Sequence, residues 1–400
     1  MFTVLLLMLM SHQPTTPTPA SETSASPAAS PFETVVPLTT SDQFVKAGES
    51  YISPDGTQVV FQAIPKPAEG QTPDPYYSMY LATLVTNDKE DEEPRWSLTN
   101  IHRLSPEGSS NTCGWFNPVT PNRVIFASTI ESPRDGDTPG YQRDSRDYRW
   151  EFPPEMRICE VDTEEFRLVE ARTDSAVPPA LRYVEGDEQA YQAECSISPD
   201  GRHLLYTSME SGDGDIFVKD LETGVRHHIV SAPGYDGGPF FSPDGRRICY
   251  RSDRHQDDYL QIFVGELEFN DAGTIVGLER EFQVTDNEHV NWAPFWHSSG
   301  RYLVYSTSEA GHHNYEVFIV DADAGDPATG RPARYGTRTG RVTVANGFDG
   351  LPAFDAESKL MIWTSQRNDG SSQLCIAEFP TDPEVFLEVS TPEAGSGSHD

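Results

Sequence analysis

The chain has 400 residues, with 29 Lys and Arg against 63 Asp and Glu, and its formal net charge is −34. This charge excludes general affinity for nucleic acid and argues against docking on an anionic membrane surface, because both kinds of binding need a basic face. The 32 Pro and 30 Gly residues predict many turns and few long helices, which excludes a helical bundle.

The amino-terminal region predicts export. Residues Phe2–Met10 (FTVLLLMLM) form an apolar run that is too short to span a bilayer and about right for the core of a signal peptide. Cleavage after Ala20 would remove residues 1–20 and leave residues 21–33 as a linker rich in Pro, Ser and Thr. The alternative is a disordered cytoplasmic tail. Since no later stretch is long and apolar enough for a transmembrane helix, we expect a periplasmic or secreted protein.

A short turn motif recurs along the chain and is followed each time by an apolar, alternating run. The sequence S-P-D-G occurs at Ser53–Gly56, Ser198–Gly201 and Ser242–Gly245. Degenerate copies keep the same frame at Asn117–Pro118, His297–Gly300 and Asp355–Ser358. Pro presets the first corner of such a turn, Asp bonds its own backbone, and Gly takes the positive φ. Each copy therefore predicts a hairpin between two strands.

Each hairpin is followed by a third and a fourth β-run, which predicts six four-stranded antiparallel sheets. Sheets repeated in this way favour an all-β, six-bladed β-propeller as a single domain over residues 34–380. The blades are expected to begin near Ala47, Asn111, Gln192, Asp236, Asn291 and Asp349. The last repeat lacks a fourth strand, and we expect Thr34–Thr39 to supply it and close the ring. Pro37 suits an outer strand, which tolerates a missing donor.

Residues 381–400 are predicted to form a flexible acidic tail, although the EVFLEV stretch within them could add a strand. A cationic, aromatic insert, Glu131–Pro154, interrupts the second blade. Arg, Tyr and Trp are enriched in interface hot spots, so this insert is a candidate contact surface or a loop folded over its own propeller.

The cysteines form no metal-binding pattern, because they lie far apart with no C-x-x-C pair. They are Cys113, Cys159, Cys195, Cys249 and Cys375. We expect buried free thiols in strands; one or two disulfides are the alternative for an exported chain.

No catalytic signature is present in the sequence. There is no G-x-S-x-G elbow, no H-E-x-x-H motif and no Walker loop. His289 is the only histidine placed near a channel mouth, where it is either a plain loop residue or a ligand or general base. A non-enzymatic protein without a cofactor is therefore expected.

The innermost strand of each propeller blade lines the central channel, so equivalent positions form rings. The six residues at which the blades are expected to begin, from Ala47 to Asp349, form what we call the first ring. The residues two positions later are assigned to the same face of each strand and form a second ring. The polar members of the two rings form the predicted channel-mouth site: Glu49, Asn111, Gln192, Glu194, Asp236, Asn291 and Asp349. Its four carboxylates (Glu49, Glu194, Asp236 and Asp349) could bind a hard cation such as Ca²⁺. The alternative is a water-filled polar tunnel.

The repeat resembles that of the TolB-like β-propeller family, most clearly in Gly234–Arg254 (GYDGGPFFSPDGRRICYRSDR). The resemblance covers about residues 34–380 and implies the propeller fold. It does not carry over a place in TolB's cell-envelope machinery, since TolB has an additional amino-terminal domain. We expect a monomeric binding or scaffold propeller that recognises a protein or other extracellular ligand through its loops and channel mouth. The alternative is a lyase or hydrolase acting on polysaccharide with a metal at the mouth, since related repeats also form oligogalacturonate lyases.

Overall fold

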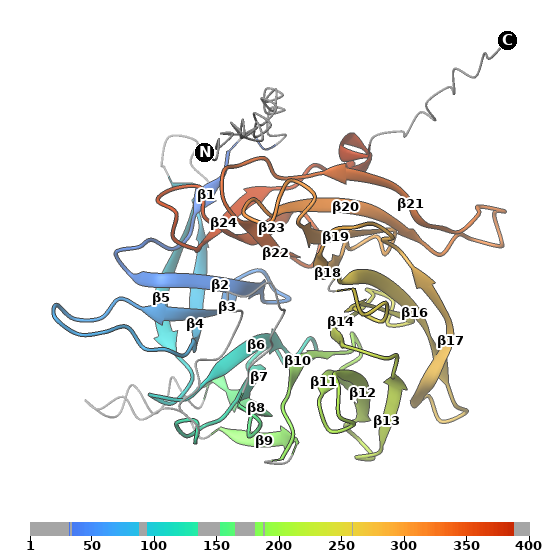
Figure 1. Cartoon of the computed structure of the whole chain (residues 1–400), viewed down its shortest axis with the longest axis horizontal. Coiled ribbons are helices and arrows are strands. Elements are labelled where there is room, and N and C mark those ends of the chain that lie inside the picture. Colours follow the sequence, from blue (N-terminus) through green and yellow to red (C-terminus); the bar gives the residue numbers. More distant parts are fainter. Residues whose placement is uncertain are drawn as a thin grey trace, which may run out of the picture.

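The computed structural model describes residues 32, 34–87, 94–134, 153–164, 181–186, 189–257 and 259–387. These residues form six four-stranded antiparallel sheets arranged around a central axis (Figure 1). The predicted six-bladed propeller is confirmed. Among the described residues no helix is long and apolar enough to cross a membrane.

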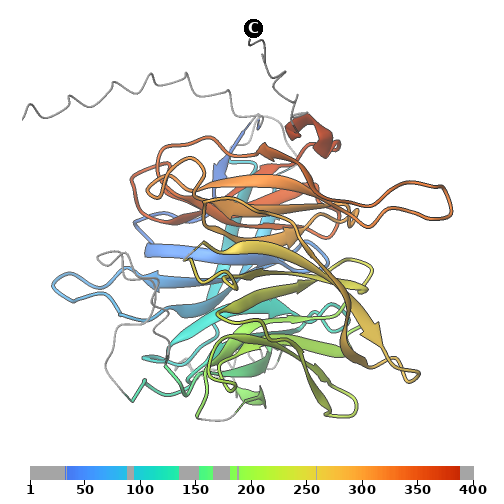
Figure 2. The same cartoon turned by 45° about the vertical axis from the view of Figure 1, so that its right-hand side comes forward.

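From the axis outward, the strands of blades 1 to 5 follow sequence order, and in blade 6 the outermost strand is β1. Blades 1 and 2 contain β2 (Phe44–Ile52), β3 (Gln58–Pro65), β4 (Ser78–Thr86), β5 (Trp96–Arg103), β6 (Asn111–Phe116), β7 (Arg123–Ser128), β8 (Arg157–Asp162) and β9 (Arg182–Glu185). Blades 3 and 4 contain β10 (Gln192–Ile197), β11 (His203–Ser208), β12 (Asp215–Asp220), β13 (Arg226–Val230), β14 (Asp236–Phe241), β15 (Arg247–Ser252), β16 (Gln261–Phe269) and β17 (Ile275–Gln283). Blades 5 and 6 contain β18 (Asn291–Trp296), β19 (Tyr302–Thr307), β20 (Glu316–Asp323), β21 (Arg334–Arg341), β22 (Asp349–Phe354), β23 (Leu360–Ser365), β24 (Gln373–Glu378) and β1 (Val36–Pro37). The hairpin between β20 and β21 projects beyond the ring (Figure 2).

Five blades begin at the residues predicted for them, and blade 1 begins three residues early, at Phe44. The turn chemistry explains this accuracy. In the first turn the Ser53 hydroxyl donates to the Asp55 carboxylate over 2.6 Å, and Gly56 takes a φ of 74°. The other two S-P-D-G turns repeat this pattern, with Gly201 at 77° and Gly245 at 66°.

Backbone hydrogen bonds join neighbouring blades at one repeated point. In five blades the N–H of the first-ring residue donates to the carbonyl that precedes the third strand of the previous blade, over 2.6–3.0 Å. These pairs are Ala47 with Ser372, Gln192 with Met156, Asp236 with Gly214, Asn291 with Leu260, and Asp349 with Tyr315. The repeat therefore fixes the contact between blades as well as each blade.

The amino-terminal strand closes the ring as predicted. Val36 and Pro37 pair with Ile376 and Cys375 of β24, so blade 6 is completed by residues from the other end of the chain. Pro37 is exposed. Only these two residues of the predicted Thr34–Thr39 segment form the strand.

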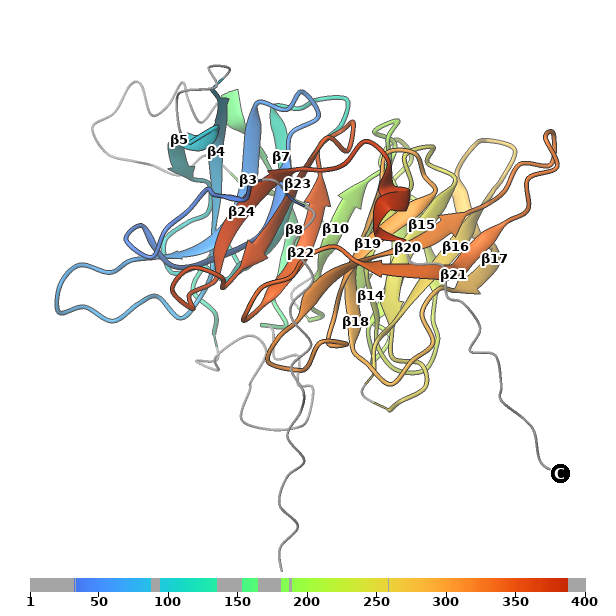
Figure 3. The same ribbon diagram turned by 90° about the horizontal axis from the view of Figure 1, so that it is seen from above.

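The expectation of a flexible tail from residue 381 does not hold for the first part of that segment. Asp382 caps a short 3₁₀-helix, η1 (Pro383–Phe386), which lies against β21 (Figure 3). Phe386 is buried and stacks on Phe379, and its ring is 6.3 Å from that of Phe32. Residues 388–400, the predicted signal peptide and most of the Glu131–Pro154 insert lie outside the described residues.

All five cysteines lie in the described part of the chain, where each is a buried free thiol. This is the arrangement expected from their spacing and strand positions.

Candidate functional site

The first ring does not point into the channel, so this part of the predicted site is wrong. The Asp236 carboxylate accepts from the Ala232 N–H over 2.8 Å and lies 3.4 Å from Arg254. Asp349 accepts from Arg367 over 2.6 Å. Both carboxylates are fully buried between strands and loops.

The amides of the first ring also bond within the blades. Asn111 donates to the Tyr77 carbonyl over 2.8 Å, Asn291 to Gln261 over 3.0 Å, and Gln192 to Ser208 over 3.3 Å. None of the six first-ring residues lines the central cavity described below. These side chains hold loops and neighbouring strands in place. His289, half-buried, also lies outside that lining; its carbonyl accepts from Asn291.

A β-bulge in every innermost strand explains why the first ring does not point into the channel. The register of each first hairpin shifts between the first ring and the position three or four residues later. The residue within each bulge has a positive φ of 41–61°, and these six residues form the bulge ring: Glu49, Cys113, Glu194, Gly238, Ala293 and Leu351. An extra residue in a strand breaks the alternation of side chains. The two rings consequently face different ways, and only the bulge ring faces the axis.

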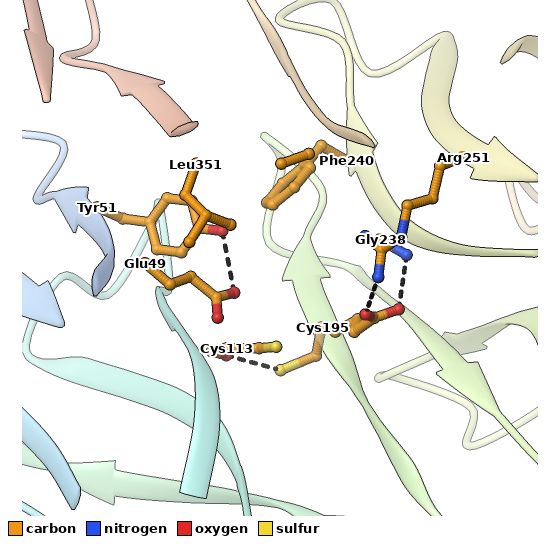
Figure 4. Close-up of a pocket in the computed structure, with 10 residues that line it drawn as sticks. Glu49, Tyr51, Cys113, Cys195, Gly238, Phe240, Arg251 and Leu351 are labelled. Carbon is orange, nitrogen blue, oxygen red and sulfur yellow. Dashed lines mark hydrogen bonds and ion pairs between the residues drawn. The ribbon is translucent and has the colours of Figure 1, made fainter. Parts of the chain in front are cut away.

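All six bulge-ring residues line a small cavity on the axis, together with Tyr51, Cys195, Phe240 and Arg251 (Figure 4). The cavity measures about 30 Å³, which is room for a water molecule or two and too little for a sugar. Its polar surface comes mainly from Glu49, Glu194 and Arg251.

Glu194 forms a buried ion pair with Arg251 across blades 3 and 4. Its carboxylate also accepts from the hydroxyl of Tyr235, from the Gly238 N–H over 2.7 Å and from Thr207 over 3.0 Å. Burial alone would raise the pKa of Glu194, but Arg251 and these hydrogen bonds outweigh it and lower the pKa. Glu194 is therefore held as an anion.

Glu49 is the less satisfied carboxylate of the cavity. It accepts from Tyr51 over 3.3 Å and from Thr112 over 3.4 Å, both long bonds. Burial raises its pKa, and the nearby charge of Glu194 raises it further. Burial also raises the pKa of the Cys113 thiol, followed by the effect of Glu49, so this thiol stays protonated.

The predicted convergence of four carboxylates is not observed. Glu49 and Glu194 share the cavity, whereas Asp236 and Asp349 are paired with arginines in the blades. Within the described residues, no three His, Cys, Asp or Glu side chains come together in a way that could hold a metal ion. The arginines take the place that a cation would have occupied at Asp236 and Asp349.

An aromatic plug closes the channel two residues beyond the bulge ring. It consists of Tyr51, Trp115, Phe240 and Phe295, from four different blades, with ring centroids 5.0–6.1 Å apart. The equivalent residues of the remaining blades are Ser196 and Ala353. These small residues leave room for the four rings, so the water-filled tunnel considered above is excluded.

A second and larger cavity lies on the other side of the plug, where the S-P-D-G turns gather. This apolar funnel measures about 240 Å³ and is floored by the four plug residues. Each blade contributes the same turn position to its wall: Pro54, Pro118, Pro199, Pro243, Ser298 and Ala356. The funnel is thus an accessible concave feature at the turn face, lined by residues of all six blades.

Comparison with known proteins agrees with this architecture. Residues 189–328 match the family model described as the TolB beta propeller domain. These residues carry the TolB-like β-propeller repeat. The family resemblance seen in the repeats is thus confirmed.

Relatives of this TolB-like propeller match it over part of their length. An uncharacterised protein of Agrobacterium fabrum is 28% identical over 33% of this chain and 43% of its own length. A Tol-Pal system protein TolB of Wolinella succinogenes is 27% identical over 42% of this chain and 35% of its own. A dipeptidyl-peptidase 5 of Porphyromonas gingivalis is 28% identical over 40% of this chain and 25% of its own length. The chain therefore spans less than half the length of these relatives.

Solved structures similar to the TolB-like propeller include both TolB proteins and enzymes. A putative TolB from Agrobacterium tumefaciens is 17% identical with a TM-score of 0.46, covering 84% of this chain and 90% of its own. An oligogalacturonate lyase in complex with manganese is 14% identical with a TM-score of 0.46, and the match covers 89% of this chain and 96% of the lyase chain. Such values transfer no activity to this chain.

Two signals in the sequence of the TolB-like propeller mark the bulges that the alternation rule overlooks. Gly238 lies inside an innermost strand, where glycine often marks a bulge. Pro239, Pro294 and Pro352 directly follow the bulge residue in blades 4, 5 and 6, and proline inside a strand is confined to edge strands and bulges. With the bulge placed there, the aromatic residues of the plug and the funnel fall on the axis.

Proposed function

We propose that this protein is a non-enzymatic binding propeller whose apolar funnel holds one or two apolar side chains of a protein partner. The observation that carries the proposal is the funnel itself, an accessible apolar cavity of about 240 Å³ built from all six blades. Rigid scaffolds that present loops around a depression are typical recognition surfaces. Burying one large apolar side chain would contribute about 1.5–3 kcal/mol to binding.

The size and chemistry of the funnel favour a protein partner over a sugar chain. Small-molecule sites usually measure about 300–1,000 Å³, which is more than the funnel offers. An oligosaccharide would bring many hydroxyls against Pro, Phe and Trp side chains, where unpaired polar groups cost free energy. The names of two relatives, Tol-Pal system protein TolB, agree with a place among interacting proteins.

The funnel can be tested by filling it. Random twelve-residue peptides displayed on phage are selected on the purified protein, and the enriched peptides are measured by calorimetry. Ser298 lies half-buried in the wall, and its hydroxyl makes no bond that the fold requires, so Ser298→Trp should fill the funnel without unfolding the protein. Ala310→Trp is the control, because Ala310 is exposed on a loop at the opposite face.

We expect selected peptides to bind the native protein and Ala310→Trp alike, and Ser298→Trp at least about tenfold more weakly, since tenfold corresponds to about 1.4 kcal/mol. Equal binding to Ser298→Trp, or the failure of any peptide to bind, would contradict the proposal.

We also propose that the protein acts outside the cytoplasm, on the basis of the apolar run Phe2–Met10. Mass spectrometry of the amino terminus of the protein from its native cell should find a chain beginning near residue 21. An intact Met1 in the cytoplasmic fraction would contradict this placement.

A further inference from the structure

The face around the funnel carries further exposed apolar side chains. In an antiparallel blade the first and third turns lie at the same end, so both sets of turns surround the funnel. Four exposed apolar residues on these turns form what we name the apolar margin: Val119 (58% exposed), Val225 (48%), Leu221 (38%) and Phe269 (38%). They belong to blades 2, 3 and 4 and are thus confined to one side of the face.

Contacts between blades fix the apolar margin in place. Val119 of blade 2 packs so closely on Gly201 of blade 3 that a Cβ there would lie 2.1 Å from it. Arg202 of blade 3 donates to the Ala272 carbonyl over 2.9 Å and to the Thr274 hydroxyl over 3.0 Å, both in blade 4. The apolar margin is therefore a preformed surface, and a partner need not order it.

Acidic side chains surround this apolar surface. Asp55, Asp200 and Asp244 are exposed at equivalent positions of three turns. The hydrogen bond from Ser53 lowers the pKa of Asp55. At Asp200 and Asp244 partial burial is outweighed by hydrogen bonds from the turn serine and backbone, and the pKa is again lowered. All three are anions at neutral pH.

Two basic side chains of this face are paired with acids, and a third lies beside an aspartate. Arg202 bonds Asp220 over 2.8 Å and lies 3.7 Å from Glu222, and Lys359 pairs with Glu357. Arg246 is exposed two residues after Asp244. The face therefore presents net negative charge around an apolar centre. Complementary charge on a partner would favour encounter and register.

We infer that the partner of the funnel is a protein segment in which an apolar side chain is flanked by Lys or Arg. The apolar side chain enters the funnel, the aliphatic stems of the flanking residues cover the apolar margin, and their charged ends reach the turn aspartates. This inference rests on the proposed function and adds the chemistry of the partner to it.

Three synthetic peptides with one apolar core test the charge preference. They are Ac-Gly-Lys-Trp-Lys-Leu-Lys-Gly-NH₂ and its counterparts with Ser or Glu in place of every Lys. In calorimetry at low salt we expect the Lys peptide to bind about tenfold more tightly than the Ser peptide, and the Glu peptide most weakly. The advantage of the Lys peptide should shrink severalfold at about 0.5 M NaCl, because salt screens exposed charges.

Matched variants locate the charge that is responsible. Asp200→Asn with Asp244→Asn removes two charges beside the funnel, and each asparagine keeps an oxygen to accept the turn hydrogen bonds. Asp257→Asn with Asp369→Asn is the control, because these exposed aspartates cap similar turns at the opposite face, accepting over 3.1 and 3.0 Å. We expect the first pair to weaken the Lys peptide about fivefold and to leave the Ser peptide unchanged, with the control pair within about twofold of the native protein.

Ser298→Trp separates this inference from the proposed function. If Ser298→Trp weakens all three peptides but the Glu or Ser peptide binds as tightly as the Lys peptide, the charge preference is wrong and the funnel remains the site. If the Lys peptide binds Ser298→Trp and the Asp200→Asn, Asp244→Asn variant as tightly as it binds the native protein, or if no peptide binds, both the inference and the proposed function are wrong.

Discussion

At the scale of single residues, Gly238 leaves the space in the bulge ring that the Arg251 guanidinium occupies. Its φ is 61°, but equivalent residues with side chains adopt 41–58°, so the backbone alone does not require glycine. A Cβ at Gly238 would lie 2.1 Å from the Arg251 guanidinium. Gly238→Ala should displace Arg251 from Glu194 and leave a buried carboxylate without its cation. We expect urea unfolding to show a loss of about 3 kcal/mol, typical of breaking a buried pair.

The matched control for this change lies in the next blade. Ala293 occupies the same position of the bulge ring at a φ of 50°. Ala293→Gly relieves a positive φ and adds chain entropy to the unfolded state, so its stability should stay within about 1 kcal/mol of the native protein. Equal stability of Gly238→Ala and the native protein would show that Arg251 does not need this space.

Asp236, which was expected at the channel mouth, should instead make the free energy of unfolding depend on pH. Burial raises its pKa to about 6, against the partial effects of its hydrogen bonds and Arg254. Since the native state then binds the proton more tightly than the unfolded state, the contribution of Asp236 to stability falls as pH rises from about 4 to 6. The free energy of unfolding of the native protein, relative to Asp236→Asn, should decrease across this range by on the order of 2 kcal/mol.

Asp244 provides the comparison of opposite sign. Its hydrogen bonds lower its pKa, so its contribution is lost as pH falls below about 4. The difference between the native protein and Asp244→Asn should therefore be constant between pH 5 and 7, and a slope there would refute the assignment to these two side chains.

At the scale of elements, the join between the chain ends rests on a few aromatic contacts. The closing strand β1 has only two paired residues, while Phe32 stacks on Trp363 and contacts Phe386 from η1. Phe386→Ala would open a cavity beneath η1, and we expect chemical denaturation to show a loss of about 3 kcal/mol. Its neighbour Val385 is 64% exposed, so Val385→Ala should change stability by less than about 0.5 kcal/mol. Similar losses for both would mean that η1 does not depend on the buried ring.

Local chemistry explains which elements could be predicted from the sequence. The S-P-D-G turns carry their own hydrogen bonds, so hairpins such as that of Ser53–Gly56 were identified from four residues, and the blade order followed. The candidate site depended on two features that such four-residue motifs do not reveal. A bulge reverses which side chains face the axis, and Asp236 is neutralised by Arg254, which lies eighteen positions later in the chain, in the turn after β15. The helix η1 was missed because its stability comes from contacts with Phe32 and Arg338, far away in sequence.

At the scale of the whole molecule, the net charge should make stability depend on salt. Of 63 acids at most 29 can be paired one to one with Lys or Arg, so at least 34 negative charges repel one another in the folded state. Added salt shortens the Debye length from about 10 Å at 0.1 M to about 3 Å at 1 M. Screening also weakens exposed ion pairs, but these are each worth little. We therefore expect the Tm at pH 7 to rise by several degrees between these concentrations, since compact states gain when self-repulsion is screened.

The control is the same salt experiment at a pH where the acidic groups of the protein are largely protonated or balanced by its basic groups. Near pH 4.5, the isoelectric point, the net charge is close to zero, and the same increase in NaCl should leave the Tm nearly unchanged. Salt acting through hydration of apolar surface would raise the Tm at both pH values, because that effect does not depend on protein charge. A rise confined to pH 7 assigns the effect to the 34 excess acids. An equal rise at both pH values, or a fall at pH 7, would show that the acidic surface is already balanced by the ion pairs within and between the blades.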